Sequence, residues 1–427
     1  MPASNDKNKA VKPEDAERHS HKSSTDEIKS ELAGASAQIS IIRLVDSLIA
    51  TAFEARASDI HLDPEEHQIR VRFRVDGVLH DNFIFPKELQ SEIITRIKIL
   101  SGMRTDEHQA AQDGRFKMVI AGHEGLDVRV SIAPTYYGEN CVMRLLAQQA
   151  GALSLESLGY SAGNLERLNR AIKKPYGMIL ATGPTGSGKT TSLYAILKKL
   201  NTKEVSIITV EDPIEYSIEG IDQIQVNART GLTFAQGLRF ILRQDPNIIM
   251  VGEIRDNETA SIAVNAAMTG HLVLSTLHTN DAATTLPRLL DMGVEPFLIA
   301  STINVAIGQR LVRTICPDCR AERELTPAEL QSLKGLVSEK ILQDKKDFSV
   351  GVGCKKCDMS GFRGRVGIHE VIEMNDELRE LIMKRATSAE IKVAAVKNGM
   401  VPMLEDGIQK AIQGLTTIEE VLRVFHE

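Results

Sequence analysis

One segment of the sequence has the residue types and spacing of a phosphate-binding loop, and it reads Gly183, Pro184, Thr185, Gly186, Ser187, Gly188, Lys189, Thr190 and Thr191. Its glycines and its Lys-Thr pair match the P-loop pattern at every fixed position. The apolar run Gly177–Thr182 precedes it and the helical pattern Lys189–Leu200 begins at its end, which is the strand-to-helix context that this motif needs. An accidental glycine-rich turn would lack these neighbours, so we predict a nucleotide-binding site.

The chemistry of a P-loop assigns a function to each part of this segment. Glycines let backbone N–H groups close around phosphates, and the helix N-terminus adds partial positive charge. Lys189 would reach the β- and γ-phosphates, and Thr190 would present its hydroxyl group to Mg²⁺. The expected ligands are therefore ATP and Mg²⁺, whereas the purpose of the hydrolysis must be inferred from other residues.

Carboxylates follow two other apolar segments. Asn247–Gly252 is a predicted strand that ends at Glu253, where a carboxylate could hold Mg²⁺ through water or orient the attacking water. A helix-capping charge is the alternative for this residue. The strand Ser206–Val210 leads into an acidic cluster that contains Glu211 and Glu215. Mutual repulsion in such a cluster indicates a cation or a function, and a solvated acidic turn is the alternative.

Two histidines bracket a further predicted strand, His271–Thr276. Side chains alternate along a strand, so His271 and His278 would not both face one side of it. A lone histidine at a strand end is more often structural than catalytic. His278 lies at the carboxyl end, where open parallel sheets place their ligands, and it is therefore the better candidate for a function.

Four of the five cysteines form two Cys-x-x-Cys pairs, and the fifth, Cys141, is a predicted buried thiol in an apolar stretch. Each pair can wrap two thiolates around one ion, and two pairs make a tetrahedral site; its ligands would be Cys316, Cys319, Cys354 and Cys357. Redox dithiols are an alternative, but neither pair follows a strand in a thioredoxin-like pattern. A nucleic-acid-binding zinc finger is a second alternative, which the charge balance disfavours. We therefore predict structural Zn²⁺.

Composition places the chain among globular proteins and disfavours several functions. At 427 residues it is too long for one ordinary core, and 42% hydrophobic with 25% charged residues is typical of soluble proteins. A net charge of −6, the absence of tryptophan and an aromatic content of 4% disfavour a nucleic-acid partner. The sequence has no apolar run of about eighteen residues and no signal-peptide pattern, so we expect a cytoplasmic protein.

The elements that must position these residues begin with an N-terminal part. Residues 1–35 are polar and are predicted to be a disordered tail. Residues 36–147 are predicted to form a small α/β domain, with a half-buried strand over Gln68–Val75, where apolar residues alternate with polar ones, mostly arginines. Residues 148–160, which contain glycines and serines, are the predicted linker.

The second part begins with alternating short apolar strands and helices over residues 161–315. This alternation predicts an α/β fold, with a parallel sheet covered on both faces, around the P-loop. Residues 316–370 are predicted to be a zinc-binding module, and residues 371–427 an amphipathic helical region.

Four segments taken together resemble the secretion ATPase superfamily, in the branch that powers type II secretion and type IV pilus extension. They are the P-loop, the acidic segment Val210–Tyr216, the segment Asn247–Asp256 and the histidine segment Thr269–Asp281. The resemblance runs from about Ser36 to the C-terminus and includes both cysteine pairs. This combination of segments is specific for that family.

The resemblance implies a fold and the parts of a mechanism. Each chain would have an N-terminal α/β domain and a RecA-like motor domain with ATP in the cleft between them. Glu253 would be the Walker B carboxylate, Glu211 and Glu215 would form an acidic box, and His278 would belong to a histidine box. The arginines implied to act on the nucleotide are Arg129 and Arg144 in the first domain and Arg239, Arg243 and Arg255 in the motor. Arg239 and Arg243 are four residues apart on a predicted helix, so we expect them to share one face of it. Positive charge aimed at a γ-phosphate is what phosphoryl transfer needs.

The resemblance also implies partners. Six chains would form a ring that acts on an inner-membrane platform protein, with membrane association through protein partners and no direct nucleic-acid contact. Members of the family often begin with a further N-terminal docking domain, whereas polar residues precede Ile39 here, so we expect another docking route or a reduced variant. A retraction motor and a nucleotide-binding scaffold with little hydrolysis are the alternative functions. The intact Lys189, Thr190 and Glu253 favour an enzyme that drives assembly.

Overall fold

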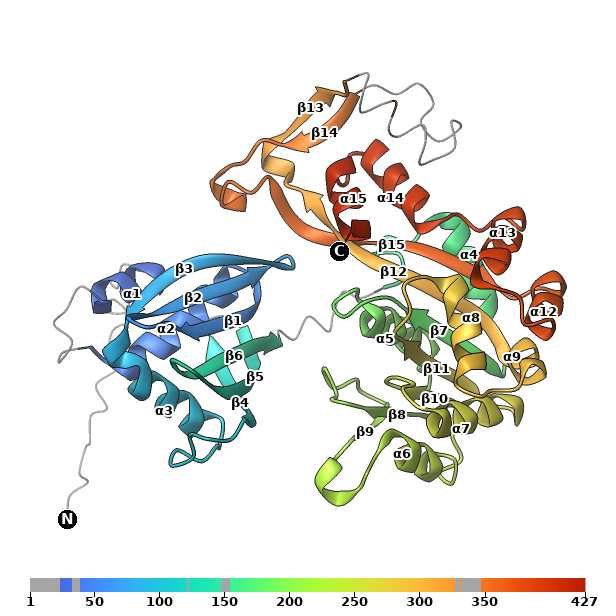
Figure 1. Cartoon of the computed structure of the whole chain (residues 1–427), viewed down its shortest axis with the longest axis horizontal. Helices are drawn as coiled ribbons and strands as arrows, with labels where there is room; N and C mark the ends of the chain where they lie inside the picture. The colour runs from blue at the N-terminus through green and yellow to red at the C-terminus, as the bar shows by residue number, and fades with distance from the viewer. Residues whose placement is uncertain are drawn as a thin grey trace, which may run out of the picture. The chain divides into compact units, whose positions relative to one another are not determined.

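The structure is a computed structural model that describes residues 24–32, 39–120, 123–146, 154–326, 331 and 347–426. The chain divides into two compact units, Met1–Gln148 and Gln149–Glu427, which Figure 1 shows coloured along the chain. The predicted linker is described only from residue 154 onward. Much of the charged segment between the cysteine pairs also lies outside the described residues.

The N-terminal unit is a six-stranded antiparallel sheet with helices on one face, in the strand order β3-β2-β1-β6-β5-β4. Its elements are α2 (Ile41–Glu54), β1 (Ala57–Pro64), β2 (Gln68–Val75), β3 (Val78–Pro86), α3 (Gln90–Leu100), β4 (Gln112–Ile120), β5 (His123–Thr135) and β6 (Gly138–Leu146). Alternation along β2 directs Ile69, Val71 and Phe73 into the core that α2 and α3 also line (Figure 1). The arginines of β2 therefore lie on the opposite face of the sheet.

The structure corrects the sequence prediction at the start of this unit. The predicted disordered tail of residues 1–35 contains a helix, α1 (Ser24–Leu32). It is fixed by Ile28, which is fully buried, and by a hydrogen bond from the Ser47 hydroxyl to Glu27 (2.9 Å). One buried isoleucine in a polar sequence is too weak a pattern to predict, because its packing partners lie in α2. Residues 1–23 and 33–38 lie outside the described residues.

The second unit is built on a seven-stranded sheet in the order β15-β12-β7-β11-β10-β8-β9. The six strands from β12 to β9 in this order are parallel, as predicted, whereas β15 pairs with β12 antiparallel. The strands are β7 (Gly177–Thr182), β8 (Ile207–Glu211), β9 (Asp222–Gln225), β10 (Ile248–Val251), β11 (Leu272–Leu277), β12 (Ile303–Ile315) and β15 (Phe362–Glu373). Every residue of β7, β8, β10 and β11 is buried, which is why these strands read as continuous apolar runs.

Helices cover both faces of this sheet. One face packs against α4 (Ala162–Ile172) and α5 (Lys189–Leu200). The other packs against α6 (Phe234–Ile241), α7 (Asn257–Met268), α8 (Ala282–Asp291) and α9 (Pro296–Thr302). The P-loop follows β7, which has a neighbouring strand on each side, β12 and β11. The loop therefore begins at an inner strand of the sheet.

The C-terminal residues share the cores of this unit, which corrects the predicted boundaries at residues 315 and 370. β15 continues from the cysteine region into the main sheet, and α12 (Asp376–Met383) and α13 (Ser388–Lys397) line the same core as α6–α9. α14 (Met403–Ile412) and α15 (Ile418–His426) pack on β12 and β15. The remaining strands, β13 (Arg320–Glu324) and β14 (Asp347–Gly351), form a separate two-stranded ribbon.

A buried ion pair fastens α15 to β12 and makes one stability prediction. Glu420 is 2% exposed and accepts hydrogen bonds from Arg313 (2.8 Å) and Arg423 (2.7 Å). Burial raises the pKa of the Glu420 carboxyl, but the two guanidinium groups outweigh it and hold that pKa at about 2. Because the folded-state pKa is below the unfolded value, this stabilisation is present above about pH 4.5 and is lost as the pH falls toward 2.

We therefore expect Glu420→Gln to lower the free energy of unfolding by roughly 3 kcal/mol at neutral pH. Urea unfolding of parent and variant at several pH values measures this difference. It should shrink progressively between about pH 4.5 and pH 2, where the carboxylate contribution is lost. A difference that stays constant over that range would mean that Glu420 stabilises the fold by packing alone.

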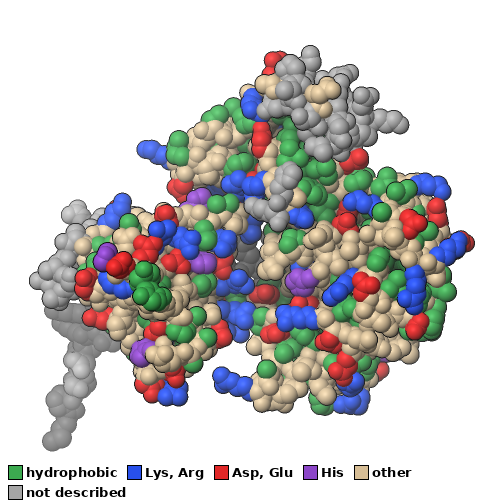
Figure 2. Space-filling view, viewed as in Figure 1, with side chains coloured by type: hydrophobic (Ala, Val, Ile, Leu, Met, Phe, Trp, Pro, Cys, Tyr) green, Lys and Arg blue, Asp and Glu red, His purple; other side chains and the backbone are tan. Residues whose placement is uncertain are grey.

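The described helices include none that is both long and apolar enough to cross a membrane. On the visible face of the molecule, basic and acidic side chains are interspersed, with hydrophobic side chains in scattered patches (Figure 2).

Candidate functional site

The P-loop of this chain has the backbone that phosphate binding requires. β7 ends at Thr182 and α5 begins at Lys189, the bounds that the sequence pattern predicts. The connecting loop places Gly183, Gly186 and Gly188 at φ values of +144°, +79° and +85°, which side chains other than glycine rarely adopt. A Cβ atom on Gly183 would lie 2.4 Å from the Gln309 carbonyl oxygen. The loop therefore depends on glycine both for its conformation and for its contact with β12.

Lys189 is folded back over the loop. It is 8% exposed, and its Nζ donates hydrogen bonds to the carbonyl oxygens of Gly183 (2.8 Å) and Pro184 (3.1 Å). Burial lowers the pKa of Lys189, and the negative charge of Glu253 opposes that shift. The Ser187 hydroxyl is buried without a hydrogen-bond partner among the described residues. These groups fit an anion, because an ammonium and an unsatisfied donor lie together in the loop.

Glu253 follows β10 and is the carboxylate of this site. It is 8% exposed, with its oxygens 2.5 Å from Arg255 Nη2 and 3.1 Å from His278 Nε2. The hydrogen bond to this carboxylate raises the pKa of Arg255. The helix-capping alternative does not apply, since Asp256 supplies the capping hydrogen bond of α7. Glu253 is therefore an oriented carboxylate held by two cationic or hydrogen-bonding side chains.

The two histidines lie at opposite ends of β11. His278 follows the carboxyl end, beside Glu253, whereas the His271 ring bonds to the Ala266 carbonyl (2.9 Å) before the strand begins. The Thr279 backbone N–H donates to the Thr182 hydroxyl (3.0 Å), which ties the histidine segment to the end of β7. The parallel order of β7, β11 and β10 thus brings Lys189, His278 and Glu253 to one edge of the sheet.

Glu211 and Glu215 differ from the solvated acidic turn that is the alternative for this cluster. Glu211 is 2% exposed and accepts hydrogen bonds from the Tyr194 hydroxyl, the Thr209 hydroxyl (2.5 Å) and the Gln223 amide (3.1 Å). Burial, together with the charge of Glu211, raises the pKa of Tyr194. The Glu211 carboxylate thus accepts its hydrogen bonds from residues of α5 and β9, among others. Glu215, in the same acidic segment, is half-buried.

Of the three motor-domain arginines, the structure brings only Arg255 to this cluster. Arg239 pairs with Glu258 on α7 (2.5 Å), and the Arg243 guanidinium lies 4.7 Å from the Phe240 ring. The shared helix face predicted for them is wrong, because α6 ends at Ile241 and Arg243 lies in the following turn. Both side chains are exposed.

The two arginines of the N-terminal unit lie on the open face of its sheet. Arg129 on β5 is paired in register with Arg144 on β6. The Arg144 Nε donates to the Asp59 carboxylate (2.9 Å), and Asp59 is 5% exposed. Arg144 itself has a half-exposed side chain, so it can exchange this partner for another anion.

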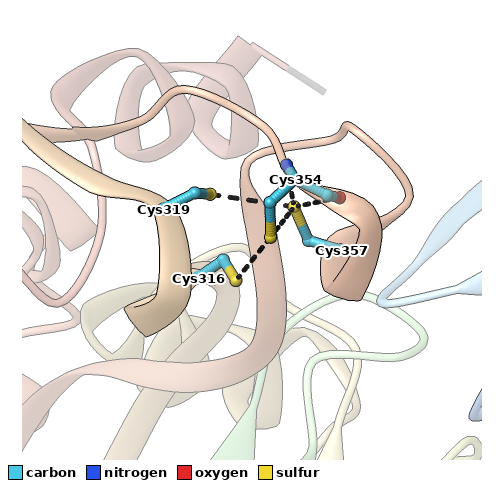
Figure 3. Close-up of side chains that lie close together, drawn as sticks. All are labelled: Cys316, Cys319, Cys354 and Cys357. Atoms are coloured by element: carbon cyan, nitrogen blue, oxygen red, sulfur yellow. Dashed lines mark hydrogen bonds between the residues drawn. The ribbon is translucent and has the colours of Figure 1, made fainter.

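The four paired cysteines form a compact cluster, with their sulfur atoms directed toward one another (Figure 3). The Sγ–Sγ distances are 3.9 Å for Cys316–Cys354, 3.8 Å for Cys319–Cys357 and 3.6 Å for Cys354–Cys357. Four sulfurs at about 2.3 Å from a tetrahedral Zn²⁺ are about 3.8 Å apart. The donor set therefore fits zinc in both type and spacing, and these distances are too long for disulfides.

Backbone N–H groups support this cluster. Although burial raises the pKa of the Cys357 thiol, hydrogen bonds from Cys354 and Gly361 and the neighbouring sulfurs lower it to about 6. Lys356 pairs with Asp318 across the two cysteine segments (2.5 Å). Cys141 is a fully buried thiol in the N-terminal unit, and burial raises its pKa.

Several residues of the site have no signal in the sequence. Tyr194 and Gln223 hold Glu211, and Gln309 on β12 contacts the P-loop through its amide. Each is an ordinary residue of a helix or strand, and its contact partner lies in another segment, 12 residues away for Gln223, 17 for Tyr194 and 122 for Gln309. Knowledge of the strand order would have been needed to find them.

Known proteins resemble this chain over most of its length. A sequence model of the family described as type II/IV secretion system protein matches residues 35–423. The type IV pilus assembly ATPase PilB of Myxococcus xanthus is 46% identical over 395 residues, which are 92% of this chain and 69% of that protein. The type II secretion system protein E of Pectobacterium carotovorum is 47% identical over 388 residues, 91% of this chain and 76% of that protein.

Solved structures have the same fold. The pilus retraction motor PilT with bound ADP superimposes with a TM-score of 0.60 and 26% identity, covering 88% of this chain and 95% of that one. The ATPase DotB of Legionella pneumophila gives a TM-score of 0.66 at 22% identity, covering 92% of this chain and 98% of that one.

Proposed function

Because this chain belongs to the type II/IV secretion system protein family and is a P-loop ATPase, we propose that its ATP hydrolysis drives assembly of a type IV pilus or type II secretion filament. The observation that supports ATP hydrolysis is that Lys189, Glu253 and His278 lie near one another, at the C-terminal ends of the parallel strands of the main sheet. The names of the relatives with 46–47% identity support assembly over retraction, since the retraction motor is only 26% identical.

The P-loop would bind ATP by exchanging its internal hydrogen bonds for phosphate contacts. Lys189 would transfer its donors from the Gly183 and Pro184 carbonyls to phosphate oxygens, and Ser187 would gain the acceptor that its hydroxyl needs. Thr190, at the start of α5, is the residue that would hold Mg²⁺, which neutralises charge on the phosphates when bound. Thr185, Gly186, Gly188 and Thr191 complete the loop around them.

Glu253 would orient the water that attacks the γ-phosphate. Arg255 and His278 hold its two oxygens, so the carboxylate has a fixed direction before the reaction begins. A scaffold that only binds nucleotide has no need of an oriented carboxylate. Glu211, bonded to Tyr194 and Gln223, would shape this edge of the sheet, and Glu215 would belong to the same acidic box.

The assembly around this enzyme would be a ring of six chains. Arg239 and Arg243 are exposed and lie outside the Glu253 cluster, so a neighbouring chain could bring them to a nucleotide. We further propose that the ring acts on a platform protein at the inner face of the cytoplasmic membrane. The four-cysteine cluster would hold a structural Zn²⁺ beside the motor core.

A complementation experiment in the source bacterium tests the proposed function. A strain that lacks this protein is supplied with the parent or with Lys189→Ala, and surface filaments and secreted proteins are measured. Loss of filaments or of secretion with Lys189→Ala supports an assembly motor. An excess of filaments would identify a retraction motor instead, and no change in either would contradict both.

Arg144→Ala tests whether the N-terminal unit acts on the nucleotide. An arginine dedicated to the transition state contributes roughly 10³–10⁵ in rate. Arg144 must first give up its Asp59 ion pair, so we expect a smaller loss, about 10- to 100-fold in kcat. Arg129→Ala, at the paired position on β5, should act in the same direction. Phosphate release by assembled protein measures both.

Arg72→Ala is the matched control for this test. Arg72 lies on the same sheet face and pairs with Asp63 on β1 (2.7 Å), as Arg144 pairs with Asp59. Its loss should change the rate by less than about threefold, because Arg72 is not among the arginines implied to act on the nucleotide and its half-buried ion pair serves the fold. Parent-like rates for both Arg129→Ala and Arg144→Ala, with unchanged assembly, would leave the N-terminal unit as a connector only.

A further inference from the structure

The carbonyl groups of a P-loop need hydrogen-bond donors that its phosphate contacts do not supply. When backbone N–H groups point at phosphates, the carbonyl groups point into the protein, where each buried one needs a donor. In this chain the Ser187 carbonyl receives its hydrogen bond from the side-chain amide of Gln309 (2.7 Å). Gln309 is 1% exposed and lies on β12, far from the P-loop in the sequence.

Gln309 lies against both the first and the last glycine of the P-loop, Gly183 and Gly188. β12 extends beyond β7, with Gly308 in register with Thr182, so the Gln309 backbone lies beside the first residue of the loop. A Cβ atom on Gly183 would meet the Gln309 carbonyl at 2.4 Å, and one on Gly188 would meet its Nε2 at 3.2 Å. The loop is therefore closed against one residue of the neighbouring strand.

Both ends of the Gln309 amide have a partner, and together these partners fix its direction. Its Oε1 accepts a hydrogen bond from the Ser192 hydroxyl on α5 (2.8 Å). Because the Ser187 carbonyl can only accept, the amide nitrogen must face it and the oxygen must face Ser192. Ser192 in turn accepts from the Tyr160 hydroxyl (3.0 Å), so its own proton is directed to Gln309.

The contacts of Tyr160 continue to the C-terminal helices, through a ring stack followed by hydrogen bonds. The Tyr160 ring stacks on the His369 imidazole, with centroids 3.7 Å apart and planes 16° apart. The His369 backbone N–H donates to Asp406 on α14 (2.8 Å), and Lys410 bonds to the same carboxylate (2.5 Å). All of these side chains are buried, so α14 is connected to the P-loop through hydrogen bonds on either side of one ring stack.

We propose that Gln309 is the positioning residue that holds the P-loop in its phosphate-binding conformation, oriented by Ser192 and Tyr160. The inference rests on the proposed binding of ATP at this loop. Gln309 touches no reacting atom; it satisfies the loop carbonyl that the bound conformation turns inward. Its loss therefore weakens nucleotide binding more than it slows the chemical step.

The test is Gln309→Met, which keeps the length of the side chain and removes both hydrogen bonds. An orphaned buried carbonyl should weaken binding of a fluorescent ATP analogue about 10- to 100-fold. The KM for ATP should rise with it, while kcat falls by less than about threefold, as expected for lost ground-state binding. Ser192→Ala leaves Gln309 in place without its orienting partner and should weaken binding about three- to tenfold.

Asn304→Leu is the matched control, since Asn304 is also a buried amide on β12. It donates to the Tyr176 carbonyl (2.8 Å) at the opposite end of β7 from the P-loop. It should lower the melting temperature as Gln309→Met does, but leave ATP affinity unchanged. If both variants weaken ATP binding equally, Gln309 acts only by stabilising the fold, and the proposal is overturned.

The remaining outcomes are also decisive. Parent-like affinity in a folded Gln309→Met protein overturns the positioning role. If that variant does not fold, Ser192→Ala carries the test, and a change of less than twofold in affinity overturns the proposal. Failure of the parent protein itself to bind ATP would instead contradict the proposed function, so the two failures are distinguishable.

Discussion

A Glu253→Gln variant is expected to bind ATP as the parent protein does and to lose about 10²–10⁴ of its turnover, the usual contribution of a positioned general base. The structure explains why the effect should be large. The carboxylate is 8% exposed, with one oxygen on Arg255 and the other on His278. Glutamine keeps the size of the side chain but removes the charge and the ability to accept a proton.

The measurement is phosphate release alongside binding of a fluorescent ATP analogue. Glu373→Gln is the control, because Glu373 also forms an ion pair at a strand end, with Arg170 (2.7 Å), away from the P-loop. It should hydrolyse ATP at the parent rate. Parent-like hydrolysis by Glu253→Gln would remove Glu253 from the catalytic residues, whereas loss of ATP binding would assign it to Mg²⁺ or nucleotide binding.

Removal of the cysteine-bound metal is expected to have the second large effect. Elemental analysis of the native protein should find one zinc per chain, held by the four-cysteine cluster. In small zinc modules the metal contributes on the order of 10 kcal/mol of apparent folding free energy. Cys354→Ser should therefore loosen the β13–β14 ribbon near the cluster, although Leu325 and Phe348 still join it to the core of α14 and α15.

The damage should remain local, because β12 and β15 are held in the main sheet on the other side of the cluster. Hydrogen exchange should rise in β13 and β14 and stay at parent levels in β7 and α5. Cys141→Ala is the matched control, since it removes a buried cysteine from the N-terminal unit and should leave the zinc content unchanged. Chelator-washed protein with almost no metal and an ordered ribbon would contradict the zinc site.

The parts of the site that are formed by residues close together in the chain could be predicted from the sequence. β7 and α5 have the bounds that the sequence predicts, Gly177–Thr182 and Lys189–Leu200, because strand, glycine loop and helix start are adjacent in the chain. The cysteine pairs were recognisable because each pair brings two ligands together by its own spacing. The preference for His278 over His271 rests on the general position of ligands on parallel sheets; it stays a prediction, and the structure places His278 beside Glu253.

Other features depended on packing between distant segments. The helix α1 is fixed by partners in α2, and the antiparallel β15 joins the cysteine region to the motor sheet. Arg239 and Arg243 do not share a helix face, because α6 ends earlier than its propensity indicates. In each of these cases, tertiary contacts outweigh the local preference of the sequence for helix or strand.

The sequence by itself identified the P-loop, from which nucleotide binding is predicted, and the family to which the chain belongs. The tertiary structure alone decided what surrounds that loop: Arg255 and His278 on Glu253, Tyr194 on Glu211, and Gln309 beneath the loop. The physical reason is the range of the interactions. Backbone conformation is set largely by neighbouring residues, whereas a side-chain contact across a sheet depends on strand order and register, which arise only when the whole core packs.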